Sequence, residues 1–128
     1  MSGPAELEKA ILEIASRRAQ ALIVRGDPLF ISNGEQIAHL AEANVLPTIS
    51  EERVFSEAGM LISYGPLVAP LTRRTAVLVD RILNGANPGD LPIEQPTKFE
   101  LVINLKTAKA LGITIPPSLL QRADQVIE

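Results

Sequence analysis

The sequence predicts an α/β fold built on a three-layer, mostly parallel sheet, and two observations lead to this prediction. Short apolar runs rich in β-branched residues alternate along the chain with segments in which apolar residues recur at helical spacing. The connections between these segments are short, as they are in right-handed crossovers between parallel strands. With 128 residues, 46% of them apolar and only 3% aromatic, the chain is long enough for one domain with an aliphatic core.

The first half of the chain supplies two helices and three strands in this prediction. Apolar residues recur every three or four positions over residues 5–19, which predicts an amphipathic helix. The run ALIVRGDP predicts a short strand that is buried on both faces. Ser32 and Glu35 have the spacing of a capping box at the start of the next helix, SNGEQIAHLAEAN. VLPTIS and MLISY are predicted to be the second and third strands.

The second half begins with a longer predicted helix over residues 67–84, with Pro70 in its first turn and Asn84-Gly85 as its stop. The residues expected on its buried side are Leu71, Thr75, Leu78, Val79 and Ile82. ANPGDLPIEQP, which contains three prolines, is predicted to be a surface connection. FELVI is predicted to be a strand, and Asn104 to cap a helix that ends at Gly112. ITIPPSLLQRADQVIE is predicted to form an extended piece and a short closing helix.

Composition narrows the functional classes. The formal charge is -3 with both signs interspersed, so neither a basic stripe nor an aromatic platform marks a nucleic-acid surface. The absence of cysteine excludes disulfides and thiolate metal sites. No apolar run is long enough to span a membrane, and the N-terminal residues lack the basic and apolar regions of a signal peptide. We therefore expect no nucleic-acid partner, no metal and no cofactor, and we expect any export signal to lie outside this sequence.

The sequence shows no catalytic constellation. His39 is the single histidine, and a partly exposed helical position is its commoner role because no second metal ligand of the right type is near in the sequence. There is no Gly-x-Ser-x-Gly elbow, and GANPG does not join a strand to a helix as a phosphate loop does. Glu51 and Glu52 are adjacent, and adjacent residues point apart on a strand. The sequence therefore predicts a protein without enzymatic activity.

Polar residues gather where the three predicted strands of the first half end, and ligands bind beyond the carboxyl ends of strands in such sheets. Asp27 or Glu51 could bind an ammonium group, Arg53 a carboxylate, and the ring of Tyr64 an apolar body. The candidate ligand-binding residues are Asp27, Pro28, Glu51, Arg53, Ser63, Tyr64 and Gly65. The alternative is that these residues are turn formers on a solvated rim. As a set, the loops are the best binding candidate in the chain.

Three stretches resemble a known family. LAEANVLPTIS (40–50), LISYGP (61–66) and residues 79–128, with GDLPIEQPTKFELVINLKTAKALGITIPPSLL inside them, look like the C-terminal part of ABC-transporter substrate-binding proteins. The specific resemblance is to the group related to tryptophan- and tyrosine-binding lipoproteins, and it extends from about Glu6 onward. The sequence departs from the family at Met60, because the family usually has a second glycine after the position of Gly59.

The resemblance implies one lobe of a type I periplasmic binding protein-like fold, in which two α/β lobes joined by crossing strands clamp a solute. It implies a periplasmic or membrane-anchored extracytoplasmic protein that delivers a small polar organic solute, such as an amino acid, to the permease of an ABC importer. Residues 5–60 would form a second-lobe unit, 61–84 a crossing strand and a helix that docks on the first lobe, and 85–128 the C-terminal loop, strand and helices. The cleft would be lined by the loops that carry the seven candidate residues.

The predicted helix at 67–84 needs a cover for its apolar stripe from Leu71 to Ile82, because large apolar patches rarely stay exposed on soluble monomers. In the absence of a first lobe, we expect the stripe to fold back onto the sheet or to pair with a second copy in a homodimer.

Two other functional classes stay open. The ligand-sensing domain of a cytosolic transcriptional regulator uses the same lobe architecture, and a helix-turn-helix encoded upstream would distinguish it from an exported protein. A flavodoxin-like enzyme would need a phosphate loop or an acid/base pair, and neither is found in the sequence.

Overall fold

The computed structural model describes residues 3–128. Met1 and Ser2, the first residues of the N-terminal stretch without signal-peptide features, lie outside the described residues. The chain divides into two compact units. The first, here called the sheet unit, contains the residues up to Gly65 together with Glu100–Glu128. The second, here called the α5 unit, is Pro66–Phe99.

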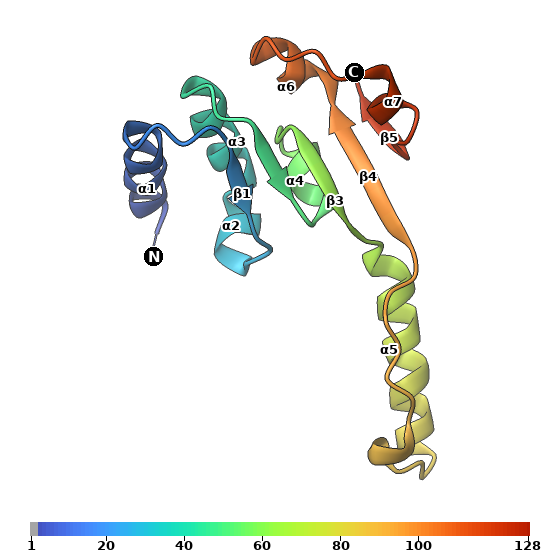
Figure 1. Cartoon of the computed structure of the whole chain (residues 1–128). Coiled ribbons are helices and arrows are strands. Elements are labelled where there is room, and N and C mark those ends of the chain that lie inside the picture. Colours follow the sequence, from blue (N-terminus) through green and yellow to red (C-terminus); the bar gives the residue numbers. More distant parts are fainter. Residues whose placement is uncertain (1–2) are drawn as a thin grey trace. The chain divides into compact units, whose positions relative to one another are not determined.

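The sheet unit is built on one five-stranded sheet with the strand order β1-β2-β3-β4-β5 (Figure 1). The strands are β1 (Leu22–Val24), β2 (Thr48–Ser50), β3 (Ile62–Pro66), β4 (Phe99–Asn104) and β5 (Gln125–Ile127). The pairs β1/β2, β2/β3 and β4/β5 are parallel. Asn104 donates its N–H to Leu61 and Leu67 to Lys98, so residue numbers rise along β3 as they fall along β4, which makes this pair antiparallel. The predicted α/β class with a mostly parallel sheet is confirmed.

Helices on this unit enclose two aliphatic cores. The helices are α1 (Pro4–Ser16), α2 (Pro28–Ser32), α3 (Gly34–Ala43), α4 (Arg53–Glu57), α6 (Leu105–Ala110) and α7 (Pro117–Leu120). The first core joins α1, α3, α4 and β1, and its buried members are Leu7, Ile11, Val24, Ile37, Ala38, Ala41, Leu46, Phe55 and Met60. The second core contains Leu61, Ile103, Ala108 and Ile115, with partly buried residues of α6 and α7 against it.

Several local predictions for this unit are confirmed. The side chain of Asn104 accepts a hydrogen bond from the Thr107 N–H at 3.2 Å and caps α6 as expected. Gly112 follows that helix at φ 68, a left-handed conformation that glycine adopts without steric cost. His39 is exposed on α3, as its helical position predicted.

Three other predictions for the sheet unit are wrong. Ser32 does not cap α3, because its hydroxyl donates to the Pro28 carbonyl within α2 and Asn33 occupies the N-cap position instead. Strand β1 is not buried on both faces, since Ile23 is 73% exposed. The C-terminal segment closes with β5 after α7, where the sequence predicted a final helix. A strand of three residues is too short for an alternation of apolar and polar residues to be recognised in the sequence.

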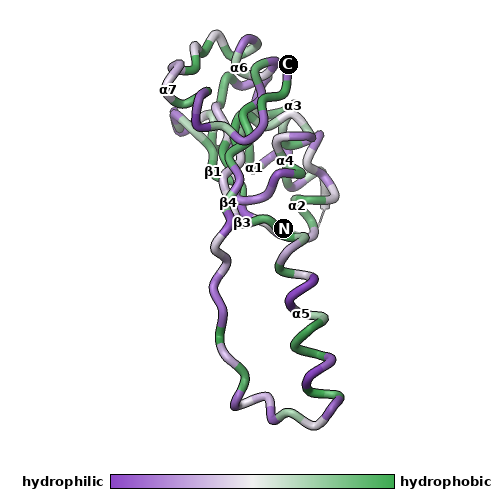
Figure 2. The backbone as a smooth tube through the Cα atoms, turned by 90° about the vertical axis from the view of Figure 1, so that its right-hand side faces the viewer, coloured by the Kyte–Doolittle hydropathy of each residue, from purple (hydrophilic) through white to green (hydrophobic). Residues whose placement is uncertain are grey.

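The α5 unit consists of α5 (Val68–Leu83), the short 3-10 helix η1 (Pro88–Asp90) and an extended return segment. The predicted helix and its stop are confirmed, with Asn84 at the C-cap and Gly85 at φ 97. Arg74 forms an ion pair with Glu94 of the return segment. Polar and apolar positions alternate along α5 at helical spacing (Figure 2).

The expected burial of the α5 stripe is not observed. None of residues 66–99 is buried; Leu71 and Leu78 are half-buried, while Val79 and Ile82 are 48% and 39% exposed. That the stripe folds back onto the sheet or pairs with a second copy stays a prediction. Within residues 3–128, no helix has both the length and the apolarity that crossing a membrane requires.

Candidate functional site

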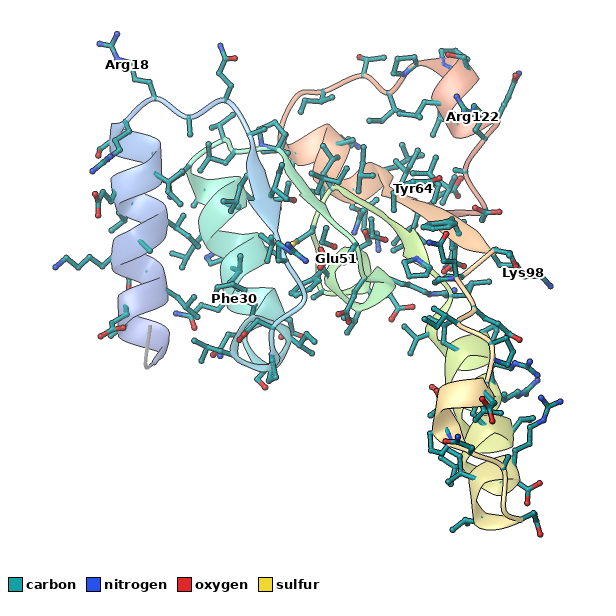
Figure 3. The ribbon with its side chains drawn as sticks, turned by 60° about the horizontal axis from the view of Figure 1, so that its bottom comes forward. Arg18, Phe30, Glu51, Tyr64, Lys98 and Arg122 are labelled. Atoms are coloured by element: carbon teal, nitrogen blue, oxygen red, sulfur yellow. The ribbon has the colours of Figure 1, made fainter. Side chains whose placement is uncertain are left out.

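The loops that follow β1 and β2 meet at the carboxyl edge of the sheet, beside β3. Parallel pairing places Val24, Ser50 and Ser63 in one row, which is the last position of β1 and of β2 but lies near the start of β3. The Glu51 side chain then reaches the first loop, where its Oε1 accepts a hydrogen bond from the Gly26 N–H at 2.9 Å. Figure 3 shows Glu51 beside the loop between β1 and α2. The loops after β1 and β2 are therefore neighbours as predicted, whereas the third predicted loop is wrong, because residues 63–65 lie within β3.

Glu51 is held as a carboxylate. The Gly26 hydrogen bond lowers the pKa of Glu51 most, and the charge of Arg25, whose Nε lies 3.7 Å from the same oxygen, lowers it further. Partial burial acts in the opposite direction and does not outweigh these contacts. Because the pKa of Glu51 is lower in the folded state, the Glu51 carboxylate stabilises the fold above the ordinary carboxyl pKa. This contribution is lost as the pH falls through the lowered pKa.

Asp27 and Pro28 start helix α2. Asp27 Oδ1 accepts a hydrogen bond from the Leu29 N–H at 2.8 Å, and Pro28 is the first helical residue, where its missing N–H costs no hydrogen bond. Both residues are exposed. The turn role that the sequence offered as an alternative is thus present, and a single cap contact leaves the carboxylate at the solvent-facing edge.

Arg53 is engaged by two carboxylates. Its Nε lies 2.6 Å from Glu57 Oε1 on α4 and its NH1 lies 3.0 Å from Glu100 Oε1 on β4. The hydrogen bond to Glu57 is the main cause of the raised pKa of Arg53, and Glu100 adds to it. The guanidinium therefore joins α4 to β4. To bind a solute carboxylate it would have to exchange or share these partners.

The third group of candidate residues lies within β3 and contains two buried residues and one exposed ring. Ser63 is 1% exposed, and its hydroxyl has no hydrogen-bond partner within residues 3–128. Tyr64 is 55% exposed and presents a large amphipathic surface on β3. Gly65 is buried where a methyl group would overlap the carbonyl oxygen of Glu51, so only glycine lets the two backbones approach this closely.

Sequence reasoning missed the residues that hold the loops in place. Gly26 supplies the amide bound by Glu51, and the Ser50 hydroxyl donates to the Glu52 carbonyl at 3.0 Å. The Gly26–Glu51 contact has no local signature, because it joins residues 25 positions apart. A groove of about 500 Å³ also opens beside this edge between α2, the start of α3 and α4. The groove contains none of the seven candidate residues.

Within residues 3–128, no three His, Asp or Glu residues lie close enough together to hold a metal ion. What the edge offers is a carboxylate at Asp27, an aromatic ring at Tyr64, a shared guanidinium at Arg53 and exposed loop backbone. Such groups can bind a small zwitterionic or polar organic molecule through charge-assisted hydrogen bonds and ring packing.

Comparison with known proteins identifies the family of the chain. A model of the family described as "ABC transporter substrate binding protein" matches residues 3–127. The chain belongs to this family. The resemblance inferred from residues 40–50, 61–66 and 79–128 is therefore confirmed, and the family consists of substrate-binding proteins rather than of enzymes.

Individual relatives agree with this membership. A tyrosine-binding protein of Clostridioides difficile (strain R20291) is 28% identical over 113 residues, which is 88% of this chain and 32% of that protein. A conserved domain protein of Vibrio cholerae has a TM-score of 0.89 at 28% identity, covering 98% of this chain and 42% of that one. An ABC domain from Streptococcus pneumonia, solved in complex with L-Trp, has a TM-score of 0.88 at 28% identity, covering 99% and 43%. These structures share the periplasmic binding protein-like fold.

The chain spans about a third of the length of the curated relative and about two fifths of the two solved structures. The activity of those whole proteins therefore includes polypeptide that has no counterpart in this chain.

Proposed function

We propose that this chain is the part of a solute-binding protein that supplies one wall of the binding cleft, and that the whole protein serves an ABC importer as its extracytoplasmic receptor. The solute is a small polar organic molecule, and aromatic amino acids are the first candidates. The observation that carries the proposal is that the loops after β1 and β2 meet at one carboxyl edge beside β3, in a chain whose matched relatives bind tyrosine or L-Trp.

The candidate residues divide this work by their chemistry. Asp27 binds the ammonium group, because its carboxylate is exposed and its one described hydrogen bond is the helix cap. Tyr64 packs its exposed ring on the apolar side chain of the solute. Arg53 binds the solute carboxylate by sharing its partners Glu57 and Glu100. The exposed loop at Pro28 lies against the solute, while Ser63 and Gly65 support the edge from buried positions in β3.

The proposal also gives the α5 unit a role. Its helix has an apolar stripe and no buried residue, as expected for a segment that docks on a first lobe outside this chain. Such a lobe completes the cleft, and the loaded two-lobed protein delivers the solute to a membrane permease. Residues 61–84 are the crossing strand and docking helix in this proposal.

A thermal-shift screen of the full-length product of the gene tests the proposal. Amino acids and related metabolites are added one at a time, because a ligand that binds only the folded state raises Tm. We expect L-Trp or L-Tyr to raise Tm, and Asp27→Asn and Tyr64→Ala to abolish the shift while the control Asp90→Asn retains it. A panel in which no amino acid changes Tm would contradict the proposed solute class.

A further inference from the structure

We propose that Glu51 is a positioning residue of the binding edge, which holds the loop at residues 25–27 in place through the Gly26 amide and does not itself touch the solute. The inference rests on the proposed function for the identity of the solute. Its structural part rests on contacts within the sheet unit alone.

The first observation is that the Glu51 carboxylate already has partners. Its Oε1 accepts the Gly26 N–H at 2.9 Å, and the Nε of Arg25 lies 3.7 Å from the same oxygen. Both partners belong to the loop after β1, while Glu51 follows β2. A charged acceptor makes this hydrogen bond stronger than one between neutral groups, so it is the kind of contact that fixes a loop.

The second observation is that the backbone of Glu51 is fixed from the other side. β3 passes so close that a methyl group on Gly65 would overlap the Glu51 carbonyl oxygen. The backbone of Glu51 therefore lies against β3 at Gly65, and its side chain contacts the loop after β1. Glu51 therefore fixes the loop after β1 relative to β3.

The consequence for binding concerns Asp27. The Gly26 amide on one side of Asp27 is bound by Glu51, and the Leu29 amide on the other side is bound by Asp27 itself. The carboxylate proposed to bind the solute is thus held on a loop with both flanks hydrogen-bonded. A loop that is already ordered loses less conformational entropy on binding, which increases affinity.

The test compares two substitutions of Glu51 in the full-length product of the gene, with L-Trp and L-Tyr titrated in a calorimeter. Glu51→Gln keeps a carbonyl oxygen that can accept the Gly26 N–H but removes the charge, whereas Glu51→Leu removes the acceptor. Glu42→Gln and Glu42→Leu are the matched controls, because Glu42 is exposed on the last turn of α3. The amide exchange rate of Gly26 is measured by NMR in the same variants without ligand.

We expect Glu51→Gln to bind within about threefold of the wild type and Glu51→Leu to bind about tenfold more weakly, the loss of one charge-assisted hydrogen bond. Exchange of the Gly26 amide should accelerate in Glu51→Leu only, and the Glu42 variants should change neither quantity. Rescue by glutamine separates positioning from contact with a solute ammonium, because such a contact needs the charge.

Two results would overturn the inference. Equal weakening by Gln and Leu would mean that the Glu51 charge touches the solute, and unchanged Gly26 exchange in Glu51→Leu would mean that the hydrogen bond does not hold the loop. If the wild type binds neither amino acid, the proposed solute class fails, and the exchange rates still decide whether Glu51 positions the loop.

Discussion

Helices α1 and α5 have similar amphipathic patterns and very different surroundings. In the sheet unit, Leu7 and Ile11 of α1 are 3% and 4% exposed because α3 covers them. In the α5 unit, Val79 and Leu83 are 48% and 81% exposed. Hydrophobic periodicity therefore predicts a helix and its apolar side, but not whether another element covers that side.

The difference has a thermodynamic consequence. Burial of apolar surface is the main favourable term in folding, so the two cores of the sheet unit should carry its cooperative stability. Residues 66–99 have no buried member and should open locally at much lower free energy. The comparison predicts that equivalent truncations in the two units will have unequal effects.

The largest expected effect is a core truncation. Phe55→Ala removes a side chain that is 0% exposed in the first core and should destabilise the chain by about 3–5 kcal/mol. Leu83→Ala at the exposed end of α5 should change the free energy of unfolding by less than about 0.5 kcal/mol. Urea denaturation of both variants measures the difference. Comparable losses would mean that α5 is covered in solution, and would break the comparison.

The second effect concerns close backbone approach at the binding edge. Gly65→Ala forces a methyl group into the Glu51 carbonyl and should cost about 1–3 kcal/mol. Gly89→Ala in η1 is the matched control in the α5 unit, because the nearest atoms to a methyl group there are Asn87 Oδ1 at 3.6 Å and Asn87 Nδ2 at 4.0 Å, both ordinary van der Waals distances. Thermal unfolding of the two variants provides the measurement. A Gly65 variant as stable as the Gly89 variant would show that β3 can move away from Glu51.

A third comparison concerns the residues that follow the C-caps Asn44 of α3 and Asn84 of α5. Gly85 follows α5 at φ 97 without strain, whereas Val45 follows α3 at φ 54, where a β-branched residue is disfavoured. Val45 is 67% exposed, so replacing it loses little burial. Val45→Asn should raise the free energy of unfolding by about 1 kcal/mol, the cost of the left-handed conformation. Denaturant midpoints check this, and a loss of stability in Val45→Asn would contradict it.

The smallest effect is electrostatic and local to the α5 unit. The pKa of Glu94 is lowered, chiefly by its hydrogen bonds with Arg74, so this carboxyl should titrate below its ordinary value in an NMR experiment. Arg74→Gln should return it toward that value. The contribution of the pair is present above the ordinary carboxyl pKa and disappears as the pH falls through the lowered one. Because both side chains are partly exposed, the global Tm should not change.

Local chemistry explains which parts of the fold could be predicted. Asn104, Gly85 and Gly112 act within one helical turn, so their roles follow from neighbouring residues. Strand β5 was missed because three residues are too few to show alternation. The capping role of Ser32 was wrong because Asn33 competes for the same position and Ser32 ends the preceding helix.

The candidate site was predictable as a set of loops but not as a set of contacts. The strand-end rule brought the loops at Asp27 and Glu51 together, because it depends only on the parallel pairing of the strands, but it placed Gly65 in a loop although Gly65 lies within β3. The contacts of Glu51 with Gly26 and of Arg53 with Glu100 join residues 25 and 47 positions apart. Nothing local in the sequence encodes such pairs, so the partners of each charge required the structure.

Hydrogen exchange with and without ligand tests the central claim that the carboxyl edge of β1–β3 binds the solute. The full-length product of the gene is exchanged alone and with saturating L-Trp or L-Tyr, and peptides are resolved by mass spectrometry. We expect ligand-dependent protection in the loops at 25–28 and 51–53 and at residues 63–65 of β3, with none in the α6–α7 segment of the sheet unit. Protection confined to other segments, with no change at residues 25–28, 51–53 and 63–65, would contradict the account.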